Sequence, residues 1–260
     1  MSPAFDRDRE AVIARAQAAG VHSLIITGSS IESSAAAAAF AQTQCNTNGN
    51  TICMTTAGVH PHNAKDWDAA ALTRLRELAA GAAALGECGL DYNRNFSPPP
   101  AQRQCFEDQL ALAAQLGKPV FLHERDAFND FLSILKKYRA NLPGAVVHCF
   151  TGGAAELDAY LELDCYIGIT GWVCDERRGG HLVPLLPRIP ANRLLLETDA
   201  PYLLPRDLSQ NAPRSTRGKS GRNEPCFLPH IAARVAAIVG KTLDQVAEET
   251  SANARRLFNY

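Results

Sequence analysis

The stretch that decides the fold is residues 118–149, KPVFLHERDAFNDFLSILKKYRANLPGAVVHC. It opens with a short apolar run, 119–123, that ends in His123, and it closes with a second run, 144–149, that contains His148. Between them, apolar residues recur at helical spacing over 126–139. A strand, a helix and a second strand in this order predict a βαβ unit with two parallel strands.

The same alternation extends in both directions along the chain. Helical stretches, among them 179–187, separate strand-like runs near residues 21, 51, 82, 119, 144, 165 and 193. Repeated βα units predict a parallel sheet. With 260 residues, 46% of them hydrophobic, the chain is large enough for one barrel-sized domain over 1–260. We therefore predict an α/β fold of the TIM-type (β/α) barrel class.

The first strand of such a barrel is missing from the pattern. A complete barrel has eight strands, whereas seven can be counted, and the sequence begins with a helical stretch over 6–19. Either the barrel is open at this edge, or the sequence starts downstream of the true beginning. We expect the second, because an unpaired edge would expose backbone groups beside the core.

Composition narrows the class of protein. The net charge is -1, from 26 Lys and Arg against 27 Asp and Glu, so any contact with nucleic acid must use local patches. The eight cysteines form no C-x-x-C pair and no apolar signal segment opens the sequence, which favours reduced thiols and a cytoplasmic protein. No apolar run approaches the roughly 18 residues that cross a bilayer, so we expect no membrane association.

Metal-binding side chains stand at four of the predicted strand ends. They are Glu87, His123, His148 and Asp199. A single histidine or carboxylate after a strand is usually structural, but four at four different strand ends are hard to obtain by accident. A parallel barrel gathers its strand ends on one face, so we predict a site there for one or two divalent ions.

The residue types suggest a division of roles. Glu87 could bridge two ions, whereas His123 and His148 would each hold one ion or share one. Asp199 could bind metal and accept the proton of an attacking water. A divalent ion lowers the pKa of its water and neutralises charge on a phosphoryl or carbonyl oxygen. We therefore take Glu87 and Asp199 as the catalytic candidates.

Other polar residues near the strand ends are candidates for substrate contact. Glu197 stands two residues before Asp199, so both point the same way in an extended backbone, and Glu197 could either contact substrate or support a metal ligand from behind. A basic loop, 205–225, follows the last strand and would overhang the metal face. Trp172 could stack on a base, and arginines could contact phosphates. The predicted substrate-binding residues are His60, Arg125, Trp172, Glu197 and Arg222.

Two common enzyme classes find no support. The chain contains neither G-x-x-x-x-G-K-[ST] nor a strand-linked G-x-G-x-x-G, which disfavours a nucleotide cofactor. It also lacks G-x-S-x-G, the nucleophile motif of one large group of serine hydrolases.

At these residues the chain resembles the TatD family of metal-dependent deoxyribonucleases, over nearly its whole length. The matching stretches are TAGVHPH (56–62), GECGLDYNRNF (86–96), KPVFLHERDA (118–127), LPGAVVHCFTG (142–152), YIGITGWVCDERRG (166–179), LLLETDAPYLLPRDL (194–208) and RNEP (222–225). Family members begin with a strand that helps to build the metal site and commonly ends in H-x-H. The match here starts at the helix that follows it.

The resemblance implies a β/α barrel and hydrolysis of DNA phosphodiesters with a divalent cation, most often magnesium, with manganese or zinc as alternatives. It further implies 3′–5′ exonuclease action on single-stranded DNA or 3′ ends, extending to RNA, and a role in DNA repair. Glu87, His123, His148 and Asp199 would be the metal residues, with His60 and Glu197 near the substrate.

Two other hypotheses stay open on the sequence alone. The barrel could belong to an amidohydrolase-like enzyme that acts on a small amide, ester or lactone. It could also be an inactive barrel that serves as a binding subunit. The basic loop and Arg125 favour a phosphate substrate over the first alternative, and retention of all four metal-type residues speaks against the second.

Overall fold

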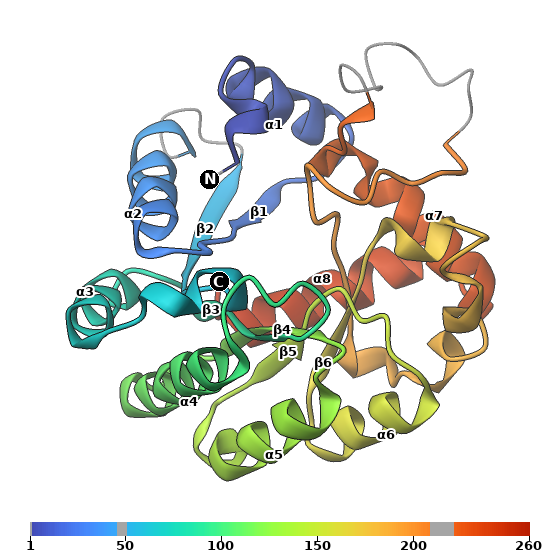
Figure 1. Ribbon diagram of the computed structural model, residues 1–260. Coiled ribbons are helices and arrows are strands. Elements are labelled where there is room, and N and C mark those ends of the chain that lie inside the picture. Colours follow the sequence, from blue (N-terminus) through green and yellow to red (C-terminus); the bar gives the residue numbers. More distant parts are fainter. Residues whose placement is uncertain (1, 46–50, 209–220) are drawn as a thin grey trace.

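Seven parallel strands form a single curved sheet in the computed structural model, which describes residues 2–45, 51–208 and 221–260 (Figure 1). Each strand pairs with its neighbour in the sequence, so that β1 and β7 lie at the edges. This confirms the predicted barrel-type fold with seven strands. The strands are β1 Ser23–Ile26, β2 Ile52–Ala57, β3 Ala84–Asp91, β4 Val120–Arg125, β5 Ala145–Val147, β6 Tyr166–Ile169 and β7 Leu194–Leu196.

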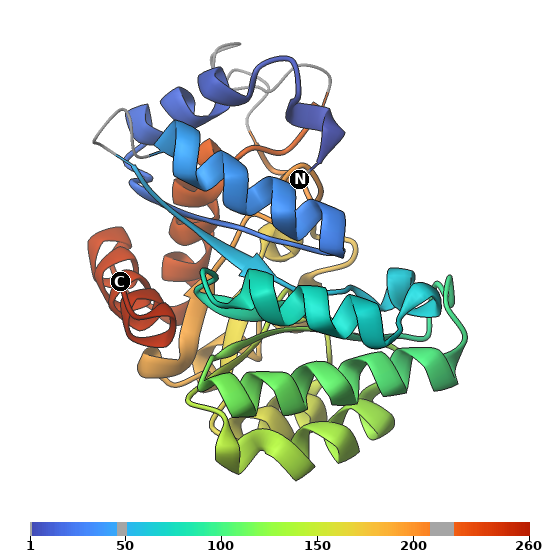
Figure 2. The same ribbon diagram turned by 90° about the vertical axis from the view of Figure 1, so that its left-hand side faces the viewer.

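Helices connect the strands and cover the outer side of the sheet, where α2, α3, α4 and α5 lie side by side in the order of the sequence (Figure 2). They are α1 Arg9–Ala18, α2 Ile31–Phe40, α3 Ala69–Ala79, α4 Pro99–Leu116, α5 Phe128–Tyr138, α6 Ala154–Glu162, α7 Leu228–Val239 and α8 Leu243–Phe258.

The helix predicted over 179–187 is wrong. Short 3-10 turns, Gly180–Leu182 and Leu186–Arg188, occupy this stretch. Pro184 and Pro187 explain the difference, because a proline inside a helix removes a backbone donor and clashes with the preceding turn. Leu182, Leu185 and Leu186 are buried even so, which is why the spacing of apolar residues resembled that of a helix.

Local signals fix where the other helices begin and end. Ser30 caps α2 through its side chain and forms a capping box with Ser33. The long helix α4 ends at Gly117, which adopts a left-handed conformation with φ of 61°. Such ends set the lengths of the connections and therefore where each strand can begin.

Alternation along the strands divides their side chains between two layers. Leu122, Val147 and Ile167 face the helices and join the large outer core. Their neighbours Phe121 and Val146 face the other way, into an inner layer that Leu257 and Phe258 of α8 complete. Because successive strand residues point to opposite faces, the next inward positions after this layer lie at the strand ends.

One expectation about the cysteines is wrong. Cys53 is disulfide-bonded, whereas the sequence favoured reduced thiols throughout. Six other cysteines carry free thiols: Cys88, Cys105, Cys149, Cys165, Cys174 and Cys226. A disulfide requires two cysteines to come within about 4.4–6.8 Å between their Cα atoms, and spacing in the sequence does not reveal such proximity.

Candidate metal centre

The predicted metal residues of β4 and β5 follow directly from strand alternation. His123 lies two residues after Phe121, and His148 lies two residues after Val146, so both imidazoles continue the inner layer. The ring of Phe121 stacks on that of His148 with 4.8 Å between centroids. The apolar inner layer therefore forms the floor beneath the two histidines.

Glu87 reaches the same face through an irregularity in β3. The pairing of β3 with β4 shifts between Leu85 and Cys88, both of which face the outer core. The extra residue in this interval turns Glu87 inward. Cys88 thus points away from the site, as alternation along the strand requires.

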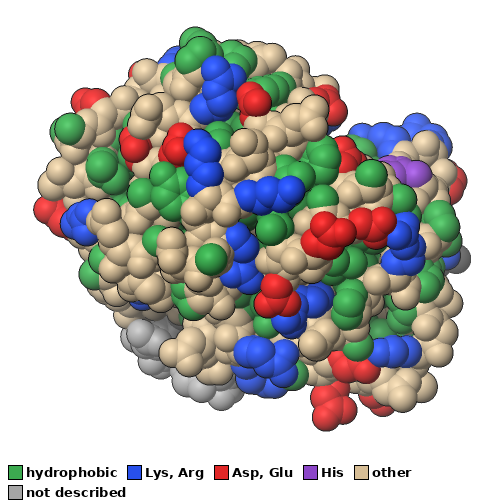
Figure 3. Space-filling model, turned by 90° about the horizontal axis from the view of Figure 1, so that it is seen from below, with side chains coloured by type: hydrophobic (Ala, Val, Ile, Leu, Met, Phe, Trp, Pro, Cys, Tyr) green, Lys and Arg blue, Asp and Glu red, His purple; other side chains and the backbone are tan. Residues whose placement is uncertain are grey.

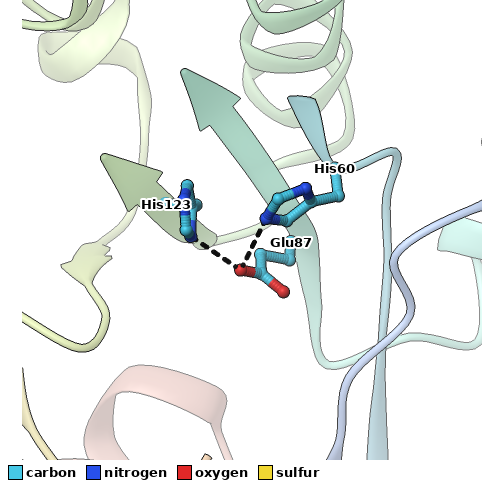
Figure 4. A group of neighbouring side chains, drawn as sticks. All are labelled: His60, Glu87 and His123. Carbon is cyan, nitrogen blue, oxygen red and sulfur yellow. Dashed lines mark ion pairs between the residues drawn. The ribbon is translucent and has the colours of Figure 1, made fainter. Parts of the chain in front are cut away.

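The Glu87 carboxylate is the centre of the group (Figure 4). Its Oε1 lies 3.3 Å from Nε2 of His60, 3.0 Å from Nδ1 of His123 and 2.9 Å from Nε2 of His148. His60 stands after β2, at the start of the turn Pro61–Asp66. Ligand atoms of His60, Glu87 and His123 all lie within 4.8 Å of one another, so these residues could hold a metal ion.

Glu197 supports His148 from the opposite side. Its Oε2 lies 3.1 Å from Nδ1 of His148, whose other nitrogen faces Glu87. A carboxylate behind a ligating imidazole fixes the ring and its tautomer, a common arrangement in metal sites. The sequence left Glu197 open between contact with substrate and support behind a metal ligand, and the structure places it against a predicted metal residue.

Asp91 and His62 complete the group, and neither is among the predicted site residues. Nε2 of His62 lies 2.7 Å from Oδ2 of the buried Asp91, and Nε2 of His123 lies 3.6 Å from the same oxygen. A signal was present in the sequence. Glu87 and Asp91 stand four residues apart, which puts both on one face of an extended strand.

Asp199 lies in the loop after β7, where it adopts a positive φ of 54°. The loop is held by the side-chain amide of Asn223, which donates to the backbone oxygens of Thr198 at 2.7 Å and Tyr202 at 2.6 Å. Burial raises the pKa of Asp199 to about 7, since the attraction of His148 only partly offsets it and Glu87 adds repulsion.

Charges in the group are strongly coupled. Burial alone would lower the pKa of His148, but Glu87 and Glu197 outweigh it and hold this pKa well above its usual value. Burial alone would also raise the pKa of Glu87, and the surrounding histidines hold it well below its usual value instead. The anionic Glu87 is in the charge state that a cation requires of a ligand, whereas a protonated His148 would have to give up its proton when an ion binds.

Two buried atoms without a hydrogen bond indicate that the residues suit an ion. Nε2 of His123, which lies 3.6 Å from Oδ2 of Asp91, and Oε1 of Glu197 have no hydrogen-bond partner among the described residues. Buried polar atoms without partners are costly and rare in folded proteins. An imidazole nitrogen and a carboxylate oxygen are suitable donors for Mg²⁺, Mn²⁺ or Zn²⁺.

The remaining predicted residues lie in different settings. Arg125 is exposed at the end of β4. Trp172 is half-buried, and the guanidinium of Arg178 lies 4.5 Å from the centre of its ring. Arg222 bonds to Asp8 at 2.8 Å and to Glu224 at 2.6 Å, so its guanidinium is engaged in an ion-pair network. Residues 209–220 of the basic loop lie outside the described residues.

Comparisons with known proteins identify the family. The family of TatD related DNases matches residues 1–259. A 3′-5′ ssDNA/RNA exonuclease TatD of Cronobacter sakazakii is 54% identical over 259 residues, which cover 99% of this chain and 94% of the relative. That of Erwinia amylovora is 51% identical over 259 residues, with 99% and 96% covered.

Solved structures of the same family share the fold. The TatD homologue YJJV from Escherichia coli superposes with a TM-score of 0.85 at 26% identity, covering 100% of this chain and 95% of its own. A TatD family hydrolase from Entamoeba histolytica gives 0.84 at 26% identity, with 96% and 89% covered. The chain belongs to the family of TatD-related DNases.

Proposed function

We propose that this chain is a metal-dependent hydrolase that removes nucleotides from the 3′ end of single-stranded DNA or RNA. The observation that carries the proposal is the carboxylate of Glu87 among three imidazoles, one of which, His123, has a buried Nε2 without a hydrogen bond. The activity itself is drawn from relatives more than half identical over almost the whole chain, whose names give this polarity and these substrates.

The metal would be held by Glu87 and His123 together with His60, whose ligand atoms lie within 4.8 Å of one another, and His148 and Asp199 are proposed as further ligands. We propose magnesium as the working ion, with manganese and zinc as alternatives that imidazole donors accept more readily. The ion supplies Lewis acidity, which stabilises negative charge on phosphoryl oxygens and makes water a better nucleophile.

The side chains of the site would orient the metal-binding residues and accept a proton. Glu197 holds Nδ1 of His148 and so orients its Nε2 toward Glu87. Asp199, with a pKa of about 7 in the absence of an ion, is suited to take the proton of the attacking water. The loop around Asp199 is fixed by Asn223, which keeps the carboxylate in place through the reaction.

Contacts to the nucleic acid would come from residues around the strand ends. Arg125 is exposed two residues beyond His123 and can reach a phosphate. Trp172 offers a ring for stacking, and Arg178 lies over it, which gives the pair both apolar area and positive charge. The predicted role of Arg222 would require it to leave its bonds to Asp8 and Glu224.

The proposal is tested by cleavage of a 5′-labelled single-stranded oligonucleotide with magnesium and with EDTA. We expect a ladder of products shortened from the 3′ end, which EDTA abolishes. Glu87→Gln should lower kcat/KM by at least about 100-fold, because it removes the central charge of the site. Glu77→Gln, an exposed change on α3, is the matched control and should leave the activity unchanged.

Asp199→Asn tests whether Asp199 acts in proton transfer or in binding of the oligonucleotide. We expect a large fall in kcat with little change in KM for the oligonucleotide, because the amide cannot accept a proton at neutral pH. Full EDTA-sensitive activity in either Glu87→Gln or Asp199→Asn would refute the assignment. Hydrolysis of a panel of small esters, with no cleavage of the oligonucleotide, would support the amidohydrolase-like alternative instead.

A role in DNA repair and a cytoplasmic location stay predictions. Among the described residues, no single helix is long and apolar enough to cross a membrane. Within residues 2–45, 51–208 and 221–260, one pair of helical segments, Pro225–Val239 and Leu243–Phe258, is long and apolar enough when taken together, and a bend of 108° separates the two segments.

A further inference from the structure

A second group of metal-binding side chains lies outside the site around Glu87. Cys174 ends the turn Gly171–Cys174 that follows β6, Asp207 lies in the segment after β7, and His230 stands in the first turn of α7. Three segments that are distant in the sequence thus bring a thiol, a carboxylate and an imidazole together. Their ligand atoms all lie within 4.8 Å of one another.

The three side chains are close neighbours. Nε2 of His230 lies 2.6 Å from Oδ1 of Asp207, and the thiol of Cys174 lies within 4.8 Å of a ligand atom of each. Cys174 is buried, with 3% of its surface exposed, whereas the side chains of His230 and Asp207 are 33% and 40% exposed. The group therefore has a buried sulfur at its base and an opening to solvent through which an ion can enter.

The donor set and the distances suit zinc. Zinc–ligand bonds of about 2.0–2.3 Å in tetrahedral geometry separate neighbouring donor atoms by roughly 3.4–3.6 Å. The bond between His230 and Asp207, now 2.6 Å, would have to open to about 3.4 Å, and the thiol, which lies no more than 4.8 Å from either ligand atom, would come within the same range. A thiolate and a carboxylate together neutralise the ion, and water would take the fourth position.

The surrounding charges do not prevent cation binding. Arg178 and Arg206 are turned toward the buried Asp175, at 2.9 Å and 3.6 Å. Arg234 lies close enough to Cys174 to favour its thiolate. Without an ion, burial raises the pKa of this thiol to about 12, so metal uptake would have to release its proton.

We propose that Cys174, Asp207 and His230 form a second metal site, for a zinc-type ion, distinct from the Glu87 centre. An ion there would fasten the segment after β7 to the turn after β6 and to α7. The first two segments also carry Asp199 and Trp172. The second ion would therefore brace two loops of the catalytic face, and it would do so whatever substrate that face accepts.

The test uses Co²⁺ as a spectroscopic substitute for zinc in the full-length protein after chelator treatment. Thiolate–cobalt bonds give an intense near-ultraviolet charge-transfer band that nitrogen and oxygen ligands do not. We expect this band in the wild type and also in Glu87→Gln, in which the first site is weakened. Zinc should remove the band by competition.

Variants assign the band to its ligands. Cys174→Ser should abolish it, and His230→Gln should weaken cobalt and zinc binding by at least about 10-fold. Two cysteine controls should keep the band. Cys226→Ser changes a half-buried free thiol elsewhere in the protein, and Cys149→Ser changes the thiol next to His148 in the sequence. Circular dichroism establishes that each variant is folded, and if Cys174→Ser is not, Asp207→Asn and His230→Gln decide.

The outcomes of this test can be distinguished from those of the nuclease assay. Absence of the band in both the wild type and Glu87→Gln would overturn the second site, even in an active nuclease. A band lost in Cys149→Ser but kept in Cys174→Ser would also overturn it, since the sulfur would then belong to the Glu87 centre. A band that depends on Cys174 in a protein without nuclease activity would support the site alone.

Discussion

Gly168 in β6 makes room for the carboxylate that orients His148. A Cβ built on Gly168 would lie 1.7 Å from Oε1 of Glu197 and 3.2 Å from the Cα of His148. Any side chain at this position must therefore push Glu197 away from Nδ1 of His148. A glycine inside a strand often marks such a close approach, and here it permits a contact that supports the metal centre.

We expect Gly168→Ala to damage the site more than the fold. The displaced Glu197 would no longer hold His148, which should lower kcat/KM by about 10–100-fold. Overpacking should reduce the free energy of unfolding by about 1–3 kcal/mol. Oligonucleotide cleavage and urea denaturation measure the two effects.

Gly81→Ala is the matched control for this change. Gly81 precedes β3 in a turn, and a Cβ there would meet no other atom within 4 Å. Its activity and stability should stay near those of the wild type. Wild-type kcat/KM in Gly168→Ala would show that the contact between Glu197 and His148 is dispensable.

The parts of the site that could be predicted are those that depend on the pattern within one β-strand. On β4 and β5, alternation sets His123 and His148 above Phe121 and Val146, and their pattern is visible in the sequence. The irregularity in β3 is different, because it depends on pairing with β4, a contact between residues far apart in the chain. The sequence showed that Glu87 follows an apolar run, but not that β3 continues to Asp91.

The contacts of the segment before α7 could not be predicted from the sequence. Arg222 was predicted to bind substrate because it lies in a basic stretch, and the structure engages its guanidinium with Asp8 in the segment before α1. The amide of Asn223, its neighbour, instead reaches the loop of Asp199. Only the fold determines which of two adjacent side chains faces the site.

Asn223 connects the segment before α7 to the catalytic loop. Its amide donates to the oxygens of Thr198 and Tyr202, which flank Asp199, and its backbone N–H donates to Pro201 at 3.1 Å. Asn223 itself is fully buried. It satisfies backbone groups that the irregular loop cannot pair by itself.

Asn223→Ala should therefore release the loop that carries Asp199. Two carbonyls would lose their donor, at a cost of about 1–3 kcal/mol in the free energy of unfolding. We expect kcat to fall further than this loss of stability explains, because Asp199 would no longer be held in place. Asn129→Ala, an exposed change on α5, should alter neither quantity. Unchanged kcat in folded Asn223→Ala would contradict the positioning role.

At the scale of the whole molecule, an ion-pair network joins the first helix to the segment before α7. Arg15 lies 2.7 Å from the buried Glu224, and Arg222 lies 2.8 Å from Asp8. The partners are more than 200 residues apart in the sequence. The network binds α1 to residues 222 and 224, which stand on either side of Asn223.

This network predicts a loss of stability in acid. Hydrogen bonds from Arg222 hold the pKa of Asp8 at about 2, below the usual 3.8, although burial opposes them. A lowered pKa stabilises the fold above the unfolded value, and this contribution is lost as pH falls from about 4 to about 2. Urea denaturation should show Asp8→Asn less stable by about 1–2 kcal/mol near pH 6 and equal to the wild type near pH 2.

Asp6→Asn provides the comparison for Asp8→Asn. Asp6 is an exposed aspartate two residues away, whose partner Arg9 lies one turn further along the chain. Its substitution should change stability little at any pH. A deficit in Asp8→Asn that persists unchanged down to pH 2 would have to come from packing rather than from charge.

The distribution of charge limits how the molecule can hold a nucleic acid. The net charge is -1, and on the face seen from below Figure 1, Lys and Arg side chains are interspersed with Asp and Glu (Figure 3). Such a surface does not attract a long polyanion over its whole extent. Binding should therefore depend on a few local contacts around the strand ends.

Few phosphate contacts predict a shallow dependence of affinity on salt. For single strands, the slope of log K against log salt falls by about 0.7 for each phosphate contact. Arg125→Gln should therefore reduce its magnitude by about 0.7, whereas Lys136→Gln, an exposed change on α5, should leave it unaltered. Fluorescence anisotropy of a labelled oligonucleotide, with Glu87→Gln as the background and a fixed metal concentration, would give the slope. Equal changes in the two variants would mean that Arg125 acts through the general charge of the protein and contacts no particular phosphate.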